Sequence, residues 1–292
     1  MDRAREQAQG IVRSVEAARR PRPSNWWTYL LMAIALLFFL FPVYWMLATA
    51  VKPPAEWLTN PPVFWPSSVH WQNFTDALGQ YGGAKGLGDS AIVAVSSTIL
   101  SMVVGVLAGY SLGRYRTGGS NLSFFILSIL FMPPVAVGIP MFLFWSSLGQ
   151  IDTYQVLVVQ YAVFNVPFVT WIMKGFFEDM PPTLEESALV NGASRLQALY
   201  QVVLPLAVPA MVATALLTFI FSWNEFFFAV ILTRGSVTTL PFILPTLMES
   251  HNILWGDIAA IATLGALPPI IVAFALQKYL VRGLSFGAVR QA

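Results

Sequence analysis

The chain has 292 residues, of which 57% are hydrophobic and only 10% are charged, and its mean hydropathy is +0.66. Soluble domains carry roughly a quarter charged residues, so this composition indicates an integral membrane protein. The net charge of +2 gives no reason to expect a nucleic-acid partner, and the absence of cysteine excludes disulfides and thiolate chemistry.

The first 25 residues are polar and rich in arginine, and they end in RRPRPSN. This pattern is typical of a segment that is solvated or lies on a membrane surface. We therefore expect residues 1–25 to form a tail outside the membrane.

Six apolar runs reach the length of about 20 residues that an α-helix needs to cross a bilayer. The first is too long for the core of a signal peptide and begins with aromatic residues that are typical of a membrane interface. The predicted fold class is therefore an all-α integral membrane protein with six transmembrane helices. The predicted spans are Trp26–Ala50, Ala91–Leu112, Leu122–Leu148, Tyr154–Phe176, Leu206–Leu232 and Ile258–Leu280.

The basic residues divide unevenly between the two faces of this six-span arrangement. Thirteen of the sixteen belong to the tail, the second and fourth loops and the C-terminus, and three belong to the opposite face. Loops rich in Lys and Arg stay in the cytoplasm, so both termini are predicted to be cytoplasmic. The three exceptions are Lys52, Lys85 and Arg234.

Several predicted spans contain helix-breaking or small residues. Pro133 and Pro134 interrupt the third span, and prolines also occur in the fourth and sixth. The second span carries a small residue at every fourth position from Ser101 to Gly113, which favours close packing against another helix.

A polar segment, residues 183–205, separates the fourth and fifth spans on the predicted cytoplasmic side. Its pattern predicts a short helix, a sharp turn and a second short helix. Such short helices need a packing surface, and this surface is either the membrane and the chain's own helices or a cleft in another protein. The signals are the capping pairs Thr183/Glu186 and Ser194/Gln197, the turn Asn191-Gly192, and Pro205 at the start of the fifth span.

The spacing in this segment resembles a known signature. Glu186-Ser187-Ala188, then Gly192, then Val202 and Leu204-Pro205 are similar to the EAA motif of permease subunits of bacterial ABC importers. Three small departures, Ser187, Asn191 and Val202, are compatible with the helix-turn-helix. The stretches GFFEDMPPTLEESALVNGAS, SWNEFFFAV and LVRGLSFGAV resemble the maltose-type, carbohydrate-uptake subfamily, and the resemblance extends over nearly the whole chain from Trp26.

This resemblance implies a type I importer permease fold and a role for residues 183–205 as the coupling helix that docks on a cytoplasmic ATPase. It implies a bacterial inner-membrane location, a heterodimer with a second permease, and a binding protein outside the cell that delivers a sugar. The chain has no P-loop motif, so it is expected to be non-catalytic and without a cofactor, with ATP and Mg bound by the ATPase. The implied coupling residues are Glu185, Glu186, Ser187, Ala188, Leu189, Asn191, Gly192 and Ala193.

The predicted organisation is an N-terminal tail (1–25), a six-span permease domain (26–282) and a C-terminal tail (283–292). The C-terminal tail is a candidate contact with the ATPase.

Glu225 is the one charged residue well inside a predicted span, where charge is costly. We expect Asn224 and Glu225 to face a water-filled cavity and Trp223 to offer its ring to a sugar. Alternatively, Glu225 makes a structural hydrogen bond near the outer interface. Asn165 is a further candidate for the path, or it satisfies the carbonyl that Pro167 frees.

Two other classes of function remain open at this point. An ion-coupled secondary transporter would show inverted repeats and intramembrane ion ligands. A membrane-embedded enzyme would show paired acids or an HExxH motif. Neither set of features is evident in the sequence. An importer of the same superfamily for a non-carbohydrate solute is a closer alternative.

Overall fold

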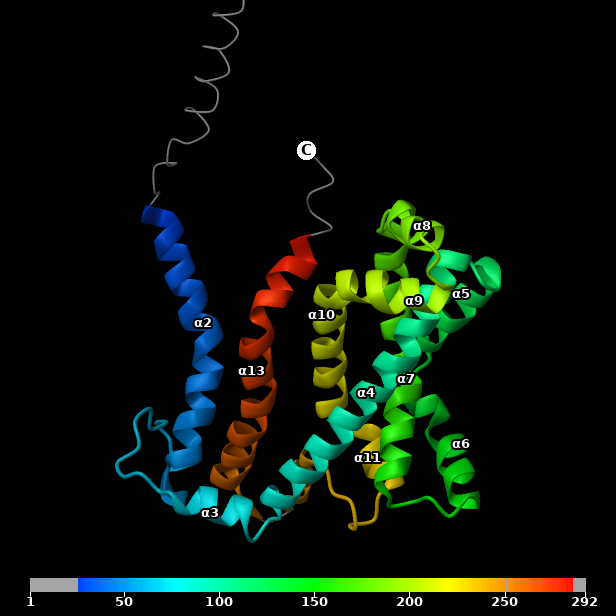
Figure 1. Ribbon diagram of the computed structural model, residues 1–292. Coiled ribbons are helices and arrows are strands. Elements are labelled where there is room, and N and C mark those ends of the chain that lie inside the picture. Colours follow the sequence, from blue (N-terminus) through cyan, green and yellow to red (C-terminus); the bar gives the residue numbers. More distant parts are fainter. Residues whose placement is uncertain (1–25, 250–251, 286–292) are drawn as a thin grey trace, which may run out of the picture. The chain divides into compact units, whose positions relative to one another are not determined.

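Figure 1 shows a computed structural model of the chain, which describes residues 26–249 and 252–285. The predicted tail at 1–25, His251 and residues 286–292 of the predicted C-terminal tail lie outside the described residues. The chain divides into two compact units, one ending at Met46 and the other beginning at Leu47.

The first unit contains most of α2 (Trp26–Val51), an uninterrupted helix that holds Pro42 within it. Its aromatic start is ordered by stacking of Trp26 on Trp27, with ring centroids 3.7 Å apart. The predicted first span is therefore one continuous helix of 26 residues.

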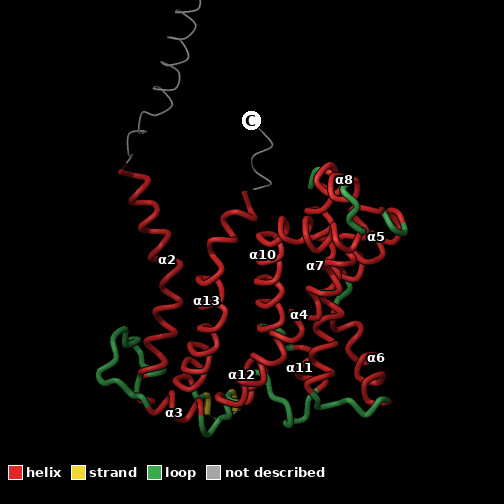
Figure 2. Tube along the Cα trace, in the orientation of Figure 1, coloured by secondary structure: helices red, strands yellow, loops and turns green. Residues whose placement is uncertain are grey.

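The second unit is a bundle whose long helices are α4 (Gly83–Tyr115), α7 (Tyr154–Asp179), α10 (Leu204–Trp223) and α13 (Trp255–Ser285). Figure 2 shows that most of its loops lie at the two ends of these helices. Helix α13 runs past residue 282, so the predicted start of the C-terminal tail falls within a helix.

Within the described residues, five helices are long and apolar enough to cross a membrane, and a bent pair makes a sixth if it counts as one span. This pair combines α5 (Gly119–Ser128), the short 3-10 helix η2 (Ile129–Phe131) and α6 (Pro134–Ser147), and it bends by 95°. Pro133-Pro134 stands at the break, as predicted, because proline forces the residue before it out of the helical region.

Helix α4 packs closely on α7 through its glycines. A Cβ atom on Gly109 would lie 2.9 Å from the Lys174 backbone nitrogen, and one on Gly105 would lie 2.6 Å from the Val169 Cβ. These distances are too short for any side chain, so the small-residue stripe serves tight packing.

The predicted fifth span is not one helix. Helix α10 ends at Trp223, and α11 (Phe227–Leu232) begins after a break at residues 224–226. The break was not predicted, because only two polar residues, Asn224 and Glu225, interrupt the apolar run. The Glu225 carboxylate accepts the Phe228 backbone N–H at 3.0 and 3.2 Å and so satisfies a donor in the first turn of the new helix.

Short elements close the end of the bundle opposite residues 182–203. They are η1 (Pro54–Glu56), α3 (Gln72–Leu78), α12 (Leu240–Thr246) and the antiparallel pair β1 (Met248–Glu249) and β2 (Asn252–Ile253), in which Met248 pairs with Ile253. The buried Asn73 donates to the Ala50 and Lys52 carbonyls at 3.0 and 2.9 Å and so fixes α3 on the end of α2.

Asp152, between α6 and α7, fastens the loop that follows α11. Its carboxylate accepts the backbone N–H groups of Arg234, Ser236 and Val237 at 2.9, 2.9 and 3.1 Å. Burial raises the pKa of Asp152, but these hydrogen bonds outweigh burial and hold the pKa well below its usual range. The carboxylate is therefore charged and bound at physiological pH.

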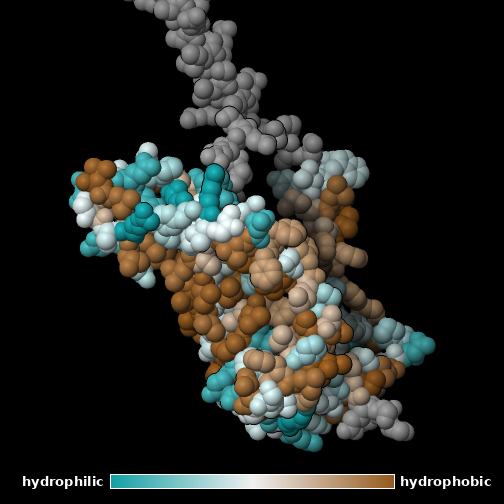
Figure 3. All heavy atoms as spheres, turned by 90° about the vertical axis from the view of Figure 1, so that its right-hand side faces the viewer, coloured by the Kyte–Doolittle hydropathy of each residue, from teal (hydrophilic) through white to brown (hydrophobic). Residues whose placement is uncertain are grey.

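The surface that carries α5, α6 and α8 (Pro182–Val190) has an apolar middle. Figure 3 shows brown side chains over this middle and hydrophilic side chains gathered at the upper end, beside α8. The lower end also carries hydrophilic side chains (Figure 3), so the apolar middle lies between two polar ends, as in a membrane-embedded bundle.

Candidate coupling site

The polar segment between α7 and α10 folds as helix, turn, helix at one end of the bundle (Figure 1). It contains α8, the short α9 (Arg195–Ala198) and a π-helical stretch, η3 (Leu199–Val203), that continues into α10. Pro205 lies in the first turn of α10, where proline is tolerated, so it stands at the start of the fifth span as predicted.

The two predicted capping boxes have different outcomes. Ser194 and Gln197 cap α9 reciprocally, with the Gln197 side chain accepting the Ser194 N–H at 2.7 Å. Thr183 makes no cap, because α8 already begins at Pro182 and its N-cap is Pro181. Between the helices Gly192 has φ +89°, as the turn requires, while Asn191 keeps a negative φ.

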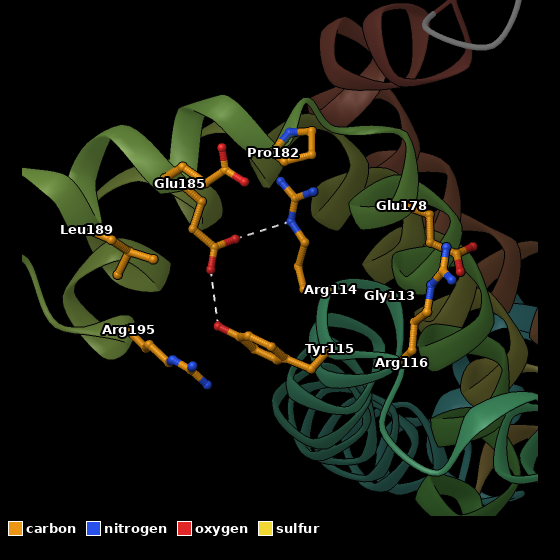
Figure 4. A pocket seen from close by; sticks show the side chains of 10 residues that line it. Gly113, Arg114, Tyr115, Arg116, Glu178, Pro182, Glu185, Leu189 and Arg195 are labelled. Carbon is orange, nitrogen blue, oxygen red and sulfur yellow. Dashed lines mark hydrogen bonds and ion pairs between the residues drawn. The ribbon is translucent and has the colours of Figure 1, made fainter.

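Glu185 anchors α8 to the end of α4. Its carboxylate accepts the hydroxyl protons of Tyr110 at 2.5 Å and Tyr115 at 3.1 Å, and it pairs with the Arg114 Nε at 3.2 Å. Figure 4 shows the Arg114 and Tyr115 side chains directed at this carboxylate. The Glu185 side chain is 9% exposed, so its charge is largely removed from water and needs these partners.

Arg114 extends the same network to the link before α8. Its guanidinium donates to the carbonyls of Met180 at 2.8 Å and Pro181 at 3.3 Å. One arginine of α4 thus holds both the start of α8 and a carboxylate within it, and α8 is tied to α4 at several atoms.

A cavity of about 480 Å³ opens between α8, α9 and the end of α4. Arg195 stacks on Tyr115 at its side, with 5.1 Å between the guanidinium carbon and the ring centroid. Three arginines and three glutamates line this cavity, so it offers both signs of charge to a partner. The lining residues are Gly113, Arg114, Tyr115, Arg116, Glu178, Pro182, Glu185, Glu186, Leu189 and Arg195 (Figure 4).

The other implied coupling residues lie mostly on the outer surface of this segment. Glu186, Ser187, Asn191 and Gly192 are exposed, Leu189 lines the cavity, and Ala188 and Ala193 are half-buried. Glu185 is the exception, since it contacts its own chain. Arg114 and Tyr110, which bind Glu185, were not predicted as its partners. The available signal was that both stand at the end of a predicted span, on the side of the membrane where Glu185 was also predicted to lie.

Large apolar side chains are exposed beside these polar ones. Val190 is 87% exposed and Leu196 is 67% exposed, although they stand at the hydrophilic end of the bundle. Exposed apolar surface rimmed by polar groups marks an interaction surface.

The candidate path residues do not converge on one cavity. Trp223 is buried and donates to the Gly265 carbonyl at 3.0 Å, so its ring is not offered to a ligand in this conformation, contrary to our expectation. Asn224 is exposed and donates to Ile220, and Glu225 is half-buried at the start of α11.

Asn165 joins a polar contact between three helices. Its amide donates to the Ser222 hydroxyl at 2.9 Å, and the Ser97 hydroxyl lies 3.0 Å from the same atom. The side chain therefore bonds across to α10 instead of the carbonyl that Pro167 frees. Ser97 and Ser222 were not predicted, because a lone serine in an apolar helix carries little signal.

Replacing Glu185 with alanine should lower the free energy of unfolding by roughly 3 kcal/mol, because Arg114 would keep a poorly hydrated charge without its carboxylate. Glu186→Ala, at the exposed neighbouring position, should change it by less than about 0.5 kcal/mol. Thermal unfolding of the two purified variants measures the difference. Equal stability of both variants would contradict the anchoring role of Glu185.

Comparisons with known proteins agree with this architecture. Residues 101–286 match the model of a family described as binding-protein-dependent transport system inner membrane component. A probable ABC transporter permease protein, y4oR, of Sinorhizobium fredii is 34% identical over 266 residues, which cover 90% of this chain and 95% of that protein. The trehalose/maltose transport system permease protein MalG of Thermococcus litoralis is 32% identical, covering 89% of this chain and 94% of that protein.

The fold has a counterpart among solved structures. A chain of a bacterial ABC transporter involved in the import of the acidic polysaccharide alginate superposes with a TM-score of 0.74 over 89% of this chain and 99% of its own length, at 24% identity. The relatives are permeases, so the chain is a multi-pass transport component of the inner membrane and not an enzyme. It belongs to the family of binding-protein-dependent transport system inner membrane components, the permease subunits of ABC importers.

Proposed function

We propose that this chain forms half of the path of an importer for sugars or sugar derivatives, and that a separate ATPase drives it through residues 183–205. The observation that carries this proposal is the exposed apolar surface of α8 and α9 on a segment anchored to the bundle by Glu185. A segment that is fixed to the bundle and has an exposed apolar surface can bind a partner and transmit its movement, whereas a flexible linker would not.

The orientation of the segment follows from the charges around it. Arg114, Arg116, Lys174, Arg195 and Lys278 lie at its end of the bundle, and the basic residues of the opposite end are Lys52, Lys85 and Arg234. The positive-inside rule supports a cytoplasmic location for α8 and for the end of α13. The N-terminal tail would share that side, since an even number of spans separates the two termini.

The mechanical link runs from α8 to the span α4 and then to α7. Nucleotide-driven closure of an ATPase dimer would displace α8, and the hydrogen bonds and ion pair of Glu185 would carry this displacement to the end of α4. Because the glycines of α4 leave no space against α7, these two helices would move together. The ATPase would hold ATP and Mg, and this chain would need no cofactor.

The remaining partners follow from the geometry of such a path. A single bundle lines one side of a path, so we propose a heterodimer with a second, related permease. A binding protein outside the cell would deliver the solute to the opposite end, where α3, α12 and the loop held by Asp152 lie.

The solute class rests on the named relatives. One is a trehalose/maltose permease, and another, 29% identical over 266 residues (90% of this chain, 96% of its own length), is the diacetylchitobiose uptake system permease protein DasC of Streptomyces coelicolor. The exposed Asn224 and the half-buried Glu225 offer polar atoms that suit sugar hydroxyls, whereas Asn165 would have to release its hydrogen bond to Ser222 to join them. A non-carbohydrate solute is the alternative, and a panel of sugars and other solutes tested on the associated binding protein would decide between them.

Val190→Asp should reduce the amount of ATPase that purifies with the assembled transporter by about thirtyfold, because a charge placed in an apolar contact costs at least roughly 2 kcal/mol at an interface hot spot. Leu58→Asp, at a 79% exposed position of the opposite end, is the matched control and should leave the amount unchanged. Equal ATPase recovery with Val190→Asp and with the wild type would refute the coupling role.

Glu225→Gln should lower uptake by roughly tenfold without lowering the melting temperature, because glutamine keeps an oxygen that caps α11 but loses the charge-assisted hydrogen bond to the solute. Glu225→Ala should lower both uptake and stability. Transport assays and thermal unfolding of the same preparations measure the two effects. Unchanged uptake and unchanged solute-stimulated ATPase activity in both variants would exclude Glu225 from the path.

A further inference from the structure

We call residues 183–205 the coupling segment and the cavity between α8, α9 and the end of α4 the coupling cavity. A second cavity of about 480 Å³ lies between the end of α4, α5 and α7. Helix α5 lies beside α7 at the end of the bundle that carries α8 (Figure 1). The walls of this second cavity include two large exposed apolar side chains, Phe124 and Trp171. Its lining residues are Leu112, Arg116, Gly119, Ser120, Ser123, Phe124, Leu127, Trp171, Lys174 and Glu178.

The cavity has an apolar part and a polar part. Phe124 is 72% exposed and Trp171 is 45% exposed, and together with Leu127 they offer an apolar wall to a hydrocarbon chain. Exposed aromatic side chains of this kind are typical of the level at which lipid headgroups meet acyl chains.

The polar part has an excess of positive charge. Lys174 pairs with Glu178 at 2.8 Å, and its ammonium lies 5.5 Å from the centroid of the Trp171 ring. Arg116 adds a second cation, and the hydroxyls of Ser120 and Ser123 are also in the lining. Two cations against one carboxylate leave a net charge of about +1, with neutral donors beside it.

We propose that this cavity binds one anionic phospholipid, with the phosphate beside Arg116 and Lys174 and an acyl chain along Phe124, Leu127 and Trp171. Charge complementarity selects the headgroup, since basic pockets between helices on the cytoplasmic side suit anionic lipids. The apolar wall selects a lipid over a soluble phosphate, because it would stay exposed around a ligand without a hydrocarbon chain.

Arg116 and Glu178 also line the coupling cavity, so the headgroup would contact a wall that the two cavities share. The proposal concerns lipid binding by the assembled transporter and does not depend on which solute is transported. A wrong assignment of the sugar would leave its test unaffected.

The test measures lipid retained by the assembled transporter after purification from nanodiscs of phosphatidylglycerol or phosphatidylcholine. Phosphatidylglycerol should be retained preferentially, and Arg116→Gln and Lys174→Gln should each lower its retention about fivefold, as expected for roughly 1 kcal/mol per basic residue. Lys278→Gln removes the same charge at the same end of the bundle, on α13 and outside the cavity, and should have no effect. Melting temperatures confirm that all the variants are folded.

Two further measurements distinguish binding of a whole phospholipid from binding of a soluble headgroup. Phe124→Ser should lower retention of phosphatidylglycerol, and excess soluble glycerol phosphate should fail to displace it. Equal retention of both lipids, an equal loss with Lys278→Gln, or full displacement by glycerol phosphate would each overturn the proposal, the last by assigning the cavity to soluble phosphates.

Discussion

The buried carboxylate of Glu185 is the contact on which the coupling segment depends. Its partners, Tyr110, Tyr115 and Arg114, all belong to the last turns of α4, and Arg114 also holds the carbonyls that precede α8. Removing any one partner leaves another poorly hydrated polar group unsatisfied, so the network forms as a unit. A helix of nine residues, too short to be stable by itself, is thereby fixed at one angle to the bundle.

The contacts beneath this network are equally specific. Tyr110 and Phe177 meet edge to face, with 5.5 Å between ring centroids, and belong to an apolar cluster that also contains Leu199 and Val203 of the π-helical stretch. This cluster joins α4, α7 and the start of α10. π-helical turns are often found at functional sites, and this one joins α9 to the membrane span α10. Under the proposed coupling role, movement of α8 would enter the bundle by two routes, one through Glu185 to α4 and one through α9 to α10.

Much of this architecture was predictable from local patterns. Apolar runs indicated the spans, Pro133-Pro134 indicated the break in the third, Gly192 indicated the turn, and Ser194 with Gln197 indicated the start of α9. These signals succeed because each depends on backbone geometry within a few residues. Thr183 failed as a cap because Pro182 starts α8 one residue earlier.

Side-chain roles that depend on tertiary contacts were not predictable in the same way. The sequence does not distinguish Glu185 from Glu186, yet one is buried against α4 and the other is exposed, because adjacent residues of a helix point about 100° apart. The sequence suggests that the Trp223 ring is available to stack on a sugar, but its indole N–H donates a hydrogen bond to the carbonyl of Gly265 in α13, 42 residues away. The break before α11 depends on the same Glu225 that the apolar pattern treats as an isolated charge.

Whether a partner protein inside the cell holds α8 can be measured directly, because this chain contains no cysteine. In a Val190→Cys variant the single thiol would react with a membrane-impermeant maleimide, and labelling can be compared between inside-out and right-side-out vesicles, with and without the ATPase. We expect Val190→Cys to be labelled in inside-out vesicles alone, and to be protected from the reagent once the ATPase is assembled. Labelling from outside the cell, or equal labelling with and without the ATPase, would contradict it.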